Sequence, residues 1–173
     1  VAHGLPEVSV AVSLLRRPKL LSTRDGKLYL GSTTNGLVRF DGKKFEAFDD
    51  RSSLSGGYVY DLVQAADGLL WLTTSNAIVR FDGSRFLPSP TNLHLPVIGA
   101  GASLAQARDG AIWVGTRGGG AGRYAGTELT HWFGETNGLS TNEILTVHGD
   151  AQGDVWLGGR EHASRYDGRS WTH

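Results

Sequence analysis

The side chains best suited to binding chemistry lie in short polar segments that recur between apolar ones. Two segments carry an arginine, Arg117 and Arg160, and the second continues into Glu161 and His162. Arginine can hold a carboxylate through two parallel hydrogen bonds, and nearby amide and hydroxyl groups suit a polar ligand such as a sugar or a sugar acid. The candidate ligand-binding residues are therefore Arg117, Arg160, Glu161, His162, Asn35, Asn76 and Asn137. Solvated loops contain the same residue types, so a purely structural interpretation of each stays open.

Other chemistries lack the residue patterns that they require. The six histidines show no close spacing of the zinc type, and the chain has no cysteine. Asp49 and Asp50 are adjacent in a loop, which does not give the separation of acid and base that glycoside cleavage needs. The glycines at 118–120 are followed by neither the lysine nor the helix start of a phosphate-binding loop. We therefore expect no metal, no cofactor and no catalytic residue.

The composition excludes two classes of partner. Lysine plus arginine equals aspartate plus glutamate at 17 each, so no net field favours nucleic acid or an anionic membrane surface. The apolar stretch at 8–15 is too short to span a bilayer, so we expect no membrane segment in this chain. Because the chain begins with Val1 and contains no methionine, we expect a processed or excised segment from which any targeting signal is missing.

An aromatic-centred motif returns every 42 or 43 residues, and this repeat predicts the fold. Its central residues are Tyr29, Trp71, Trp113 and Trp156. Turn dipeptides precede them at Asp25-Gly26, Asp67-Gly68, Asp109-Gly110 and Gln152-Gly153. A second set of turns follows them at Asp41-Gly42, Asp82-Gly83, Ala125-Gly126 and Asp167-Gly168. A period of this length with several short strands per unit is typical of propeller blades.

The last unit shows the expected strands of one blade most clearly. Its strands are expected at about 143–149, 155–157, 163–166 and 170–172, with Asp167 and Gly168 as the two central residues of a tight hairpin. The fold class is therefore an all-β propeller of four-stranded antiparallel blades, one domain over 1–173. Its four blades are expected at about 4–55, 56–98, 99–137 and 138–173. A recurrent arginine at positions 39, 80, 123 and 165 is expected to have a structural role.

The order of strands in a blade sorts the loops onto two sides. The tight turns between strands one and two, and between strands three and four, lie on one side and are expected to be structural. The loops between strands two and three lie on the opposite side with the connections between blades, and they differ from unit to unit. Variable loops on a rigid scaffold are where binding usually occurs, and all the candidate residues fall in them.

Several motifs in register resemble the two-component regulator propeller repeat. They are the second strands such as Leu70-Trp71-Leu72-Thr73, the segment Gly36-Leu37-Val38-Arg39-Phe40-Asp41-Gly42, and the opening Gly138-Leu139-Ser140. The resemblance covers nearly the whole chain. It implies the periplasmic or extracellular sensor portion of a bacterial hybrid histidine kinase or diguanylate cyclase, where ligands are often glycans.

Propellers of this family usually have seven or more blades, and this chain has four. An open arc would expose an apolar blade face, so we expect self-association into a homo-oligomer that closes the ring. A closed four-bladed ring and an excised part of a larger propeller are the alternatives.

Three functions are compatible with the sequence. The first is a non-enzymatic sensor or protein-interaction module that binds an oligosaccharide or another small polar ligand on its variable-loop side. The second is a lyase or glycan-processing enzyme similar to the streptogramin lyases, which would need a converging histidine and acid from candidates such as His148, His162 and Glu161. The third is an excised or engineered propeller fragment that assembles without a ligand.

Overall fold

The computed structural model describes residues 19–32, 36–48, 54, 58–75, 77–87 and 102–173. These residues form four antiparallel sheets of four strands each, in chain order. The first sheet contains β1 (Lys19–Ser22), β2 (Leu28–Gly31), β3 (Leu37–Phe40) and β4 (Phe45–Phe48). The second contains β5 (Asp61–Gln64), β6 (Leu70–Thr73), β7 (Ile78–Phe81) and β8 (Phe86–Leu87). The third contains β9 (Ser103–Gln106), β10 (Ile112–Thr116), β11 (Gly120–Ala125) and β12 (Glu128–Phe133). After the 3-10 turn η1 (Glu135–Asn137), the fourth contains β13 (Thr146–Gly149), β14 (Val155–Gly158), β15 (Ala163–Tyr166) and β16 (Trp171–Thr172).

The predicted fold class is confirmed, because each sheet is one blade of a propeller. The expected second and third strands of the last unit coincide with β14 and β15. The expected first strand is three residues too long at its start, since β13 begins at Thr146. The preceding segment pairs with the third sheet instead: Ile144 N–H donates to the Thr116 carbonyl at 2.8 Å, and Glu143 forms a bridge with Arg117.

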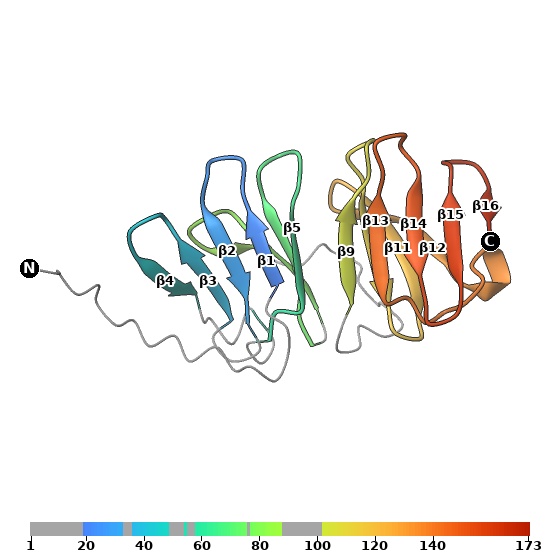
Figure 1. The fold of residues 1–173 in the computed structure, drawn as a ribbon, viewed down its shortest axis with the longest axis horizontal. Helices are drawn as coiled ribbons and strands as arrows, with labels where there is room; N and C mark the ends of the chain where they lie inside the picture. The colour runs from blue at the N-terminus through green and yellow to red at the C-terminus, as the bar shows by residue number, and fades with distance from the viewer. Residues whose placement is uncertain (1–18, 33–35, 49–53, 55–57, 76, 88–101) are drawn as a thin grey trace, which may run out of the picture.

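The four sheets form an open arc. Their first strands are the inner ones, and β5 packs against β1, β9 against β5, and β13 against β9. Across the described residues no comparable packing joins β13 to β1. Figure 1 shows the first and fourth sheets extending in opposite directions from these inner strands, with β4 and β16 at the two ends of the long axis. The described residues therefore do not close into a four-bladed ring.

The core consists of three layers, each between two consecutive sheets. The repeated aromatic of a second strand packs against the sheet that follows it. Trp71 contacts Tyr124 with ring centroids 5.7 Å apart, and Trp113 contacts Tyr166 at 5.5 Å. Every residue of β6 and β10 is buried, because each of these strands is covered by a neighbouring sheet on both faces. Two-sided burial accounts for the nearly continuous apolar sequence of the second strands.

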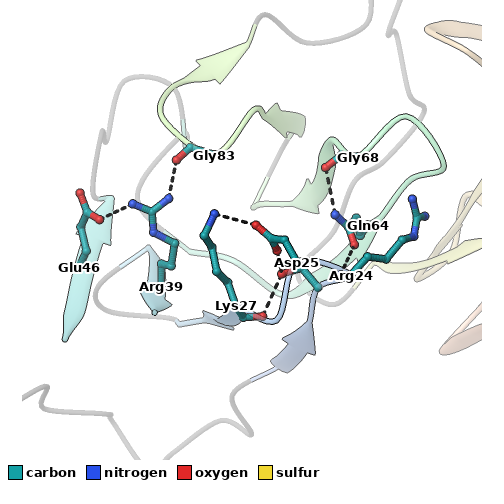
Figure 2. Close-up of polar contacts among 9 residues, drawn as sticks. Arg24, Asp25, Lys27, Arg39, Glu46, Gln64, Gly68 and Gly83 are labelled. Carbon is teal, nitrogen blue, oxygen red and sulfur yellow. Dashed lines mark hydrogen bonds and ion pairs between the residues drawn. The ribbon is translucent and has the colours of Figure 1, made fainter. Parts of the chain in front are cut away.

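The recurrent arginines contact their own sheet or the next one, in agreement with the expected structural role. Arg39 donates to the Gly83 carbonyl at 2.7 Å and pairs with Glu46, as Figure 2 shows. The Arg80 guanidinium lies 6.0 Å from the centre of the Trp71 ring. The other two pair with carboxylates, Arg123 with Asp109 and Arg165 with Asp154.

The second turn of each unit differs in detail from the prediction. Asp167 N–H donates to the Ser170 carbonyl, so the central residues of the turn are Gly168 and Arg169, and Asp167 stands just before them. Its carboxylate accepts hydrogen bonds from the N–H groups of Ser170 and Arg169, both at 2.8 Å, and these hydrogen bonds lower the pKa of Asp167. Gly168 supplies the positive φ of 93°. The aspartate thus caps the turn rather than forming its centre.

Candidate functional site

Three loops of the third and fourth sheets meet at the ends opposite the tight turns. They are the β10–β11 loop at 117–119, the β12–β13 connection at 134–145 and the β14–β15 loop at 159–162. The Asn142 carbonyl accepts hydrogen bonds from Gly118 N–H at 3.0 Å and from Gly120 N–H at 2.9 Å. These bonds attach the connection to the first loop, so the loops form one surface.

Glu143 joins the two predicted arginine segments. Its backbone forms the bridge with Arg117, and its carboxylate accepts two hydrogen bonds from Arg160 Nε at 3.0 and 3.1 Å. The Arg160 side chain is 70% exposed and that of Glu143 is 35% exposed, so water screens this ion pair. Sequence reasoning missed Glu143. The sequence signal that could have identified it is an acidic residue in the connection between the third and fourth blades. This connection lies on the same side as the loop that carries Arg160.

The connection is held by its own side chains. Glu135 Oε1 accepts from Asn142 N–H at 2.9 Å, and Asn142 Oδ1 accepts from Glu135 N–H at 3.0 Å. The predicted residue Asn137 belongs to the same network, since its Nδ2 donates to the Trp132 carbonyl at 2.8 Å and its Oδ1 accepts from Gly134 N–H. The Asn137 amide therefore stabilises the connection that contains it.

The structure brings four of the seven predicted residues to this surface. Arg117, Arg160, Glu161 and His162 are all exposed and lie within the joined loops. Asn35 and Asn76 lie outside the described residues. We define the loop surface as Arg117, Glu143, Arg160, Glu161 and His162. It presents guanidinium, carboxylate and imidazole groups to solvent, which are groups that can bind a polar molecule.

Among the described residues, no three histidine, aspartate or glutamate side chains lie close enough together to hold a metal ion. No helix in the described part of the chain is long and apolar enough to cross a membrane.

A family comparison identifies the repeat. Residues 53–76, which include β5 and β6, match the family model described as two component regulator propeller. The chain carries a two-component regulator propeller repeat. The resemblance that the sequence motifs suggested is confirmed by this match. A search of curated proteins gave no match.

Solved structures similar to this chain include the extracellular domains of two hybrid two-component systems. The extracellular domain of the hybrid two-component system BT3049 from B. thetaiotaomicron has a TM-score of 0.74 at 19% identity, over 88% of this chain and 22% of that one. The extracellular domain of the hybrid two-component system BT4673 from the same organism has a TM-score of 0.70 at 19% identity, over 93% of this chain and 25% of that one.

An enzyme shares the same architecture. Virginiamycin B lyase from Staphylococcus aureus has a TM-score of 0.70 at 18% identity, over 90% of this chain and 54% of that one. This chain thus spans about a quarter of the two extracellular domains and about half of the lyase. At these identities the likenesses establish the propeller fold and leave the choice between sensor and enzyme to the chemistry of the site.

Proposed function

We propose that this chain is a non-enzymatic ligand-sensing module of a bacterial signalling receptor, exposed to the periplasm or the cell exterior. Its repeat is of the regulator propeller type, and two of its structural neighbours are extracellular domains of two-component systems. The proposed ligand is an oligosaccharide or another polar molecule, bound on the loop surface. The observation that carries this proposal is the arrangement of Arg160, whose Nε holds Glu143 while its exposed outer edge faces solvent.

The position of His148 weakens the lyase alternative. His148 pairs with Trp156 in β13 and β14, near the turn that joins these strands. His162 and Glu161 lie in the loop at the other end of β14. A general acid and a general base must both reach the reacting atoms, so His148 cannot act together with His162 and Glu161 on one substrate.

Replacing Arg160 by alanine tests the loop surface. We expect Arg160→Ala to weaken oligosaccharide binding at least tenfold and to leave the melting temperature of the free protein nearly unchanged, because an exposed ion pair contributes about 0–1 kcal/mol. The probes are neutral and uronic-acid-containing oligosaccharides, and the measurement is the thermal shift followed by calorimetry. A ligand at 100 times its dissociation constant adds about 2.7 kcal/mol of stability.

The matched control is Arg169→Ala. Arg169 is also exposed, but it lies in the tight turn before β16, at the end of the fourth sheet opposite the loop surface. Binding should survive this change. Equal weakening by the two substitutions, or no thermal shift with any oligosaccharide, would contradict the assignment of the loop surface.

The outer faces of the first and fourth sheets each expose a large apolar side chain. Leu20 on β1 is 57% exposed and Trp156 on β14 is 43% exposed. Their equivalents within the arc are buried against each other: Leu104 packs in the same core layer as Trp71. The interface between two consecutive sheets has two halves. The outer face of the fourth sheet, with Trp156, has the residues of one half, and the outer face of the first sheet, with Leu20, has the residues of the other.

We propose that a second copy of the chain covers both faces, head to tail, through two identical interfaces. A hydrogen bond recurs between inner strands inside the arc. Asp61 Oδ2 accepts from Leu104 N–H at 2.9 Å, and Ser103 Oγ accepts from Val147 N–H at 3.2 Å. The next position in this series is Thr146, whose hydroxyl can accept from Leu20 N–H of a second copy. Two arcs joined in this way bury Trp156 as Trp71 and Trp113 are buried.

A further inference from the structure

A cavity of about 310 Å³ lies between the third and fourth sheets, near the tight turns. This position is at the opposite end of the sheets from the loop surface. The residues lining it include Ala107, Asp109, Trp113, Arg123, His131 and Tyr166. The corresponding space between the first and second sheets has a volume of only about 90 Å³ and is lined by Asp25, Lys27 and Tyr29.

Smaller side chains at two repeat positions account for the difference in volume. Between the first two sheets, Lys27 Nζ lies 2.6 Å from the Asp25 carboxylate, as Figure 2 shows, and Thr23 Oγ1 donates to the same carboxylate at 2.5 Å. Two repeats later, Ala111 stands in place of Lys27 and Ala107 in place of Thr23. The third blade therefore lacks the side chains that fill this space in the first.

No described residue accepts a hydrogen bond from the indole N–H of Trp113. Trp113 is 1% exposed, and its Nε1 is buried without a hydrogen bond. In the fourth blade, Trp156 Nε1 donates to Asp150 at 2.8 Å, and the residue equivalent to Asp150 in the third blade is Ala107. Ala107 lines the cavity together with Trp113, and the Trp113 N–H stays buried behind this wall. A buried donor without a partner costs about 1–3 kcal/mol, so the third blade lacks a stabilising contact that the fourth blade has.

The charged groups of the cavity form a neutral pair. Arg123 Nη2 lies 2.7 Å from the Asp109 carboxylate, and Arg123 Nη1 donates to Thr130 Oγ1 at 3.1 Å. Burial acts to raise the pKa of Asp109, but the hydrogen bonds from Arg123 and from Ala111 N–H hold it below its ordinary value. Asp109 is thus an ionised acceptor, and the pair leaves no excess charge to attract an ion.

We propose that this cavity binds a small neutral polyol, such as a monosaccharide or a cyclitol. A hydroxyl group both accepts and donates, so neighbouring hydroxyls of one ring can accept from the Arg123 guanidinium and donate to the Asp109 carboxylate, which both line the cavity. His131 and Tyr166 add further polar groups at the wall. The site is separate from the loop surface and does not depend on the function proposed for it.

The test is a titration of the folded chain followed by the indole N–H signals of its five tryptophans in NMR. The probes are myo-inositol and the methyl pyranosides of glucose, galactose and mannose. We expect one of these probes to shift the Trp113 signal with saturation. Ala111→Lys should refill the cavity as Lys27 does, and Ala107→Asp should give Trp113 the partner that Trp156 has. Each substitution should weaken the binding at least tenfold in a protein whose spectrum shows that it is folded.

The control is Lys27→Ala, which enlarges the space between the first two sheets and should leave the Trp113 titration unchanged. The absence of a saturable Trp113 shift with every probe would overturn the proposal. So would a shift that persists in both Ala111→Lys and Ala107→Asp, because binding would then occur elsewhere. Loss of oligosaccharide binding in Arg160→Ala would leave this result untouched, so failure of either site can be recognised separately.

Discussion

Replacing Trp113 by alanine is expected to lower the free energy of unfolding by about 4 kcal/mol. The side chain is 1% exposed, and its ring stacks on Phe133 at 5.3 Å and contacts Trp171 edge-on at 6.2 Å. Truncation of a buried tryptophan removes this packing and leaves a cavity, at a cost of about 3–5 kcal/mol. Denaturant unfolding of the native and variant chains measures the difference.

Trp156→Ala is the matched control, because Trp156 holds the same repeat position on the uncovered face of the fourth sheet and is 43% exposed. At protein concentrations where the chains are single, its replacement should cost about 1 kcal/mol. Similar losses for the two variants would contradict the open arc, since they would mean that both tryptophans are equally covered in one chain.

Threonine in place of Gly115 is expected to destabilise the chain by about 3 kcal/mol. A Cβ atom at Gly115 would lie 2.3 Å from Ile144 Cγ2, in the β12–β13 connection, and 2.7 Å from Val147 Cγ2, on the next sheet. Overpacking of this kind forces side chains and backbone apart. The equivalent residue of the second blade is Thr73, which is buried and donates to the Ala102 carbonyl at 2.9 Å. The repeat position therefore accepts threonine only where the next sheet leaves room.

Gly158→Thr provides the comparison for Gly115→Thr. Gly158 is the same position in the fourth blade, where a Cβ atom would meet only Thr146 Cγ2, at 2.9 Å. In the single chain its replacement should cost less than about 1 kcal/mol. Thermal and denaturant unfolding test both variants, and a loss below about 1 kcal/mol for Gly115→Thr would show that the third and fourth sheets do not pack as described.

The strands were predictable because single characteristic residues recur at the repeat spacing. Trp71 and Trp113 mark the second strands, and the glycines after Asp25 and Asp167 mark the turns. The hairpin at 167–170 was predicted with the wrong centre, because the pattern Asp-Gly does not reveal that the aspartate accepts hydrogen bonds from the backbone of the turn.

The candidate site was predictable only in part. Arg117 and Arg160 were found from their residue type, whereas the contact that unites their loops depends on Glu143, whose partner lies 17 residues away. The cavity between the third and fourth sheets was missed because its signal is the small size of Ala107 and Ala111. Alanine carries no binding chemistry, and its effect appears only when the repeats are superposed.

The native mass of the chain in solution tests the open arc and its closure most directly. Light scattering coupled to size exclusion should give about twice 18.5 kDa, because two arcs are needed to cover Leu20 and Trp156. Leu20→Lys should return the mass to 18.5 kDa, since it places a charge in each of the two interfaces. A native mass of 18.5 kDa for the unaltered chain at all concentrations would contradict closure by a second copy.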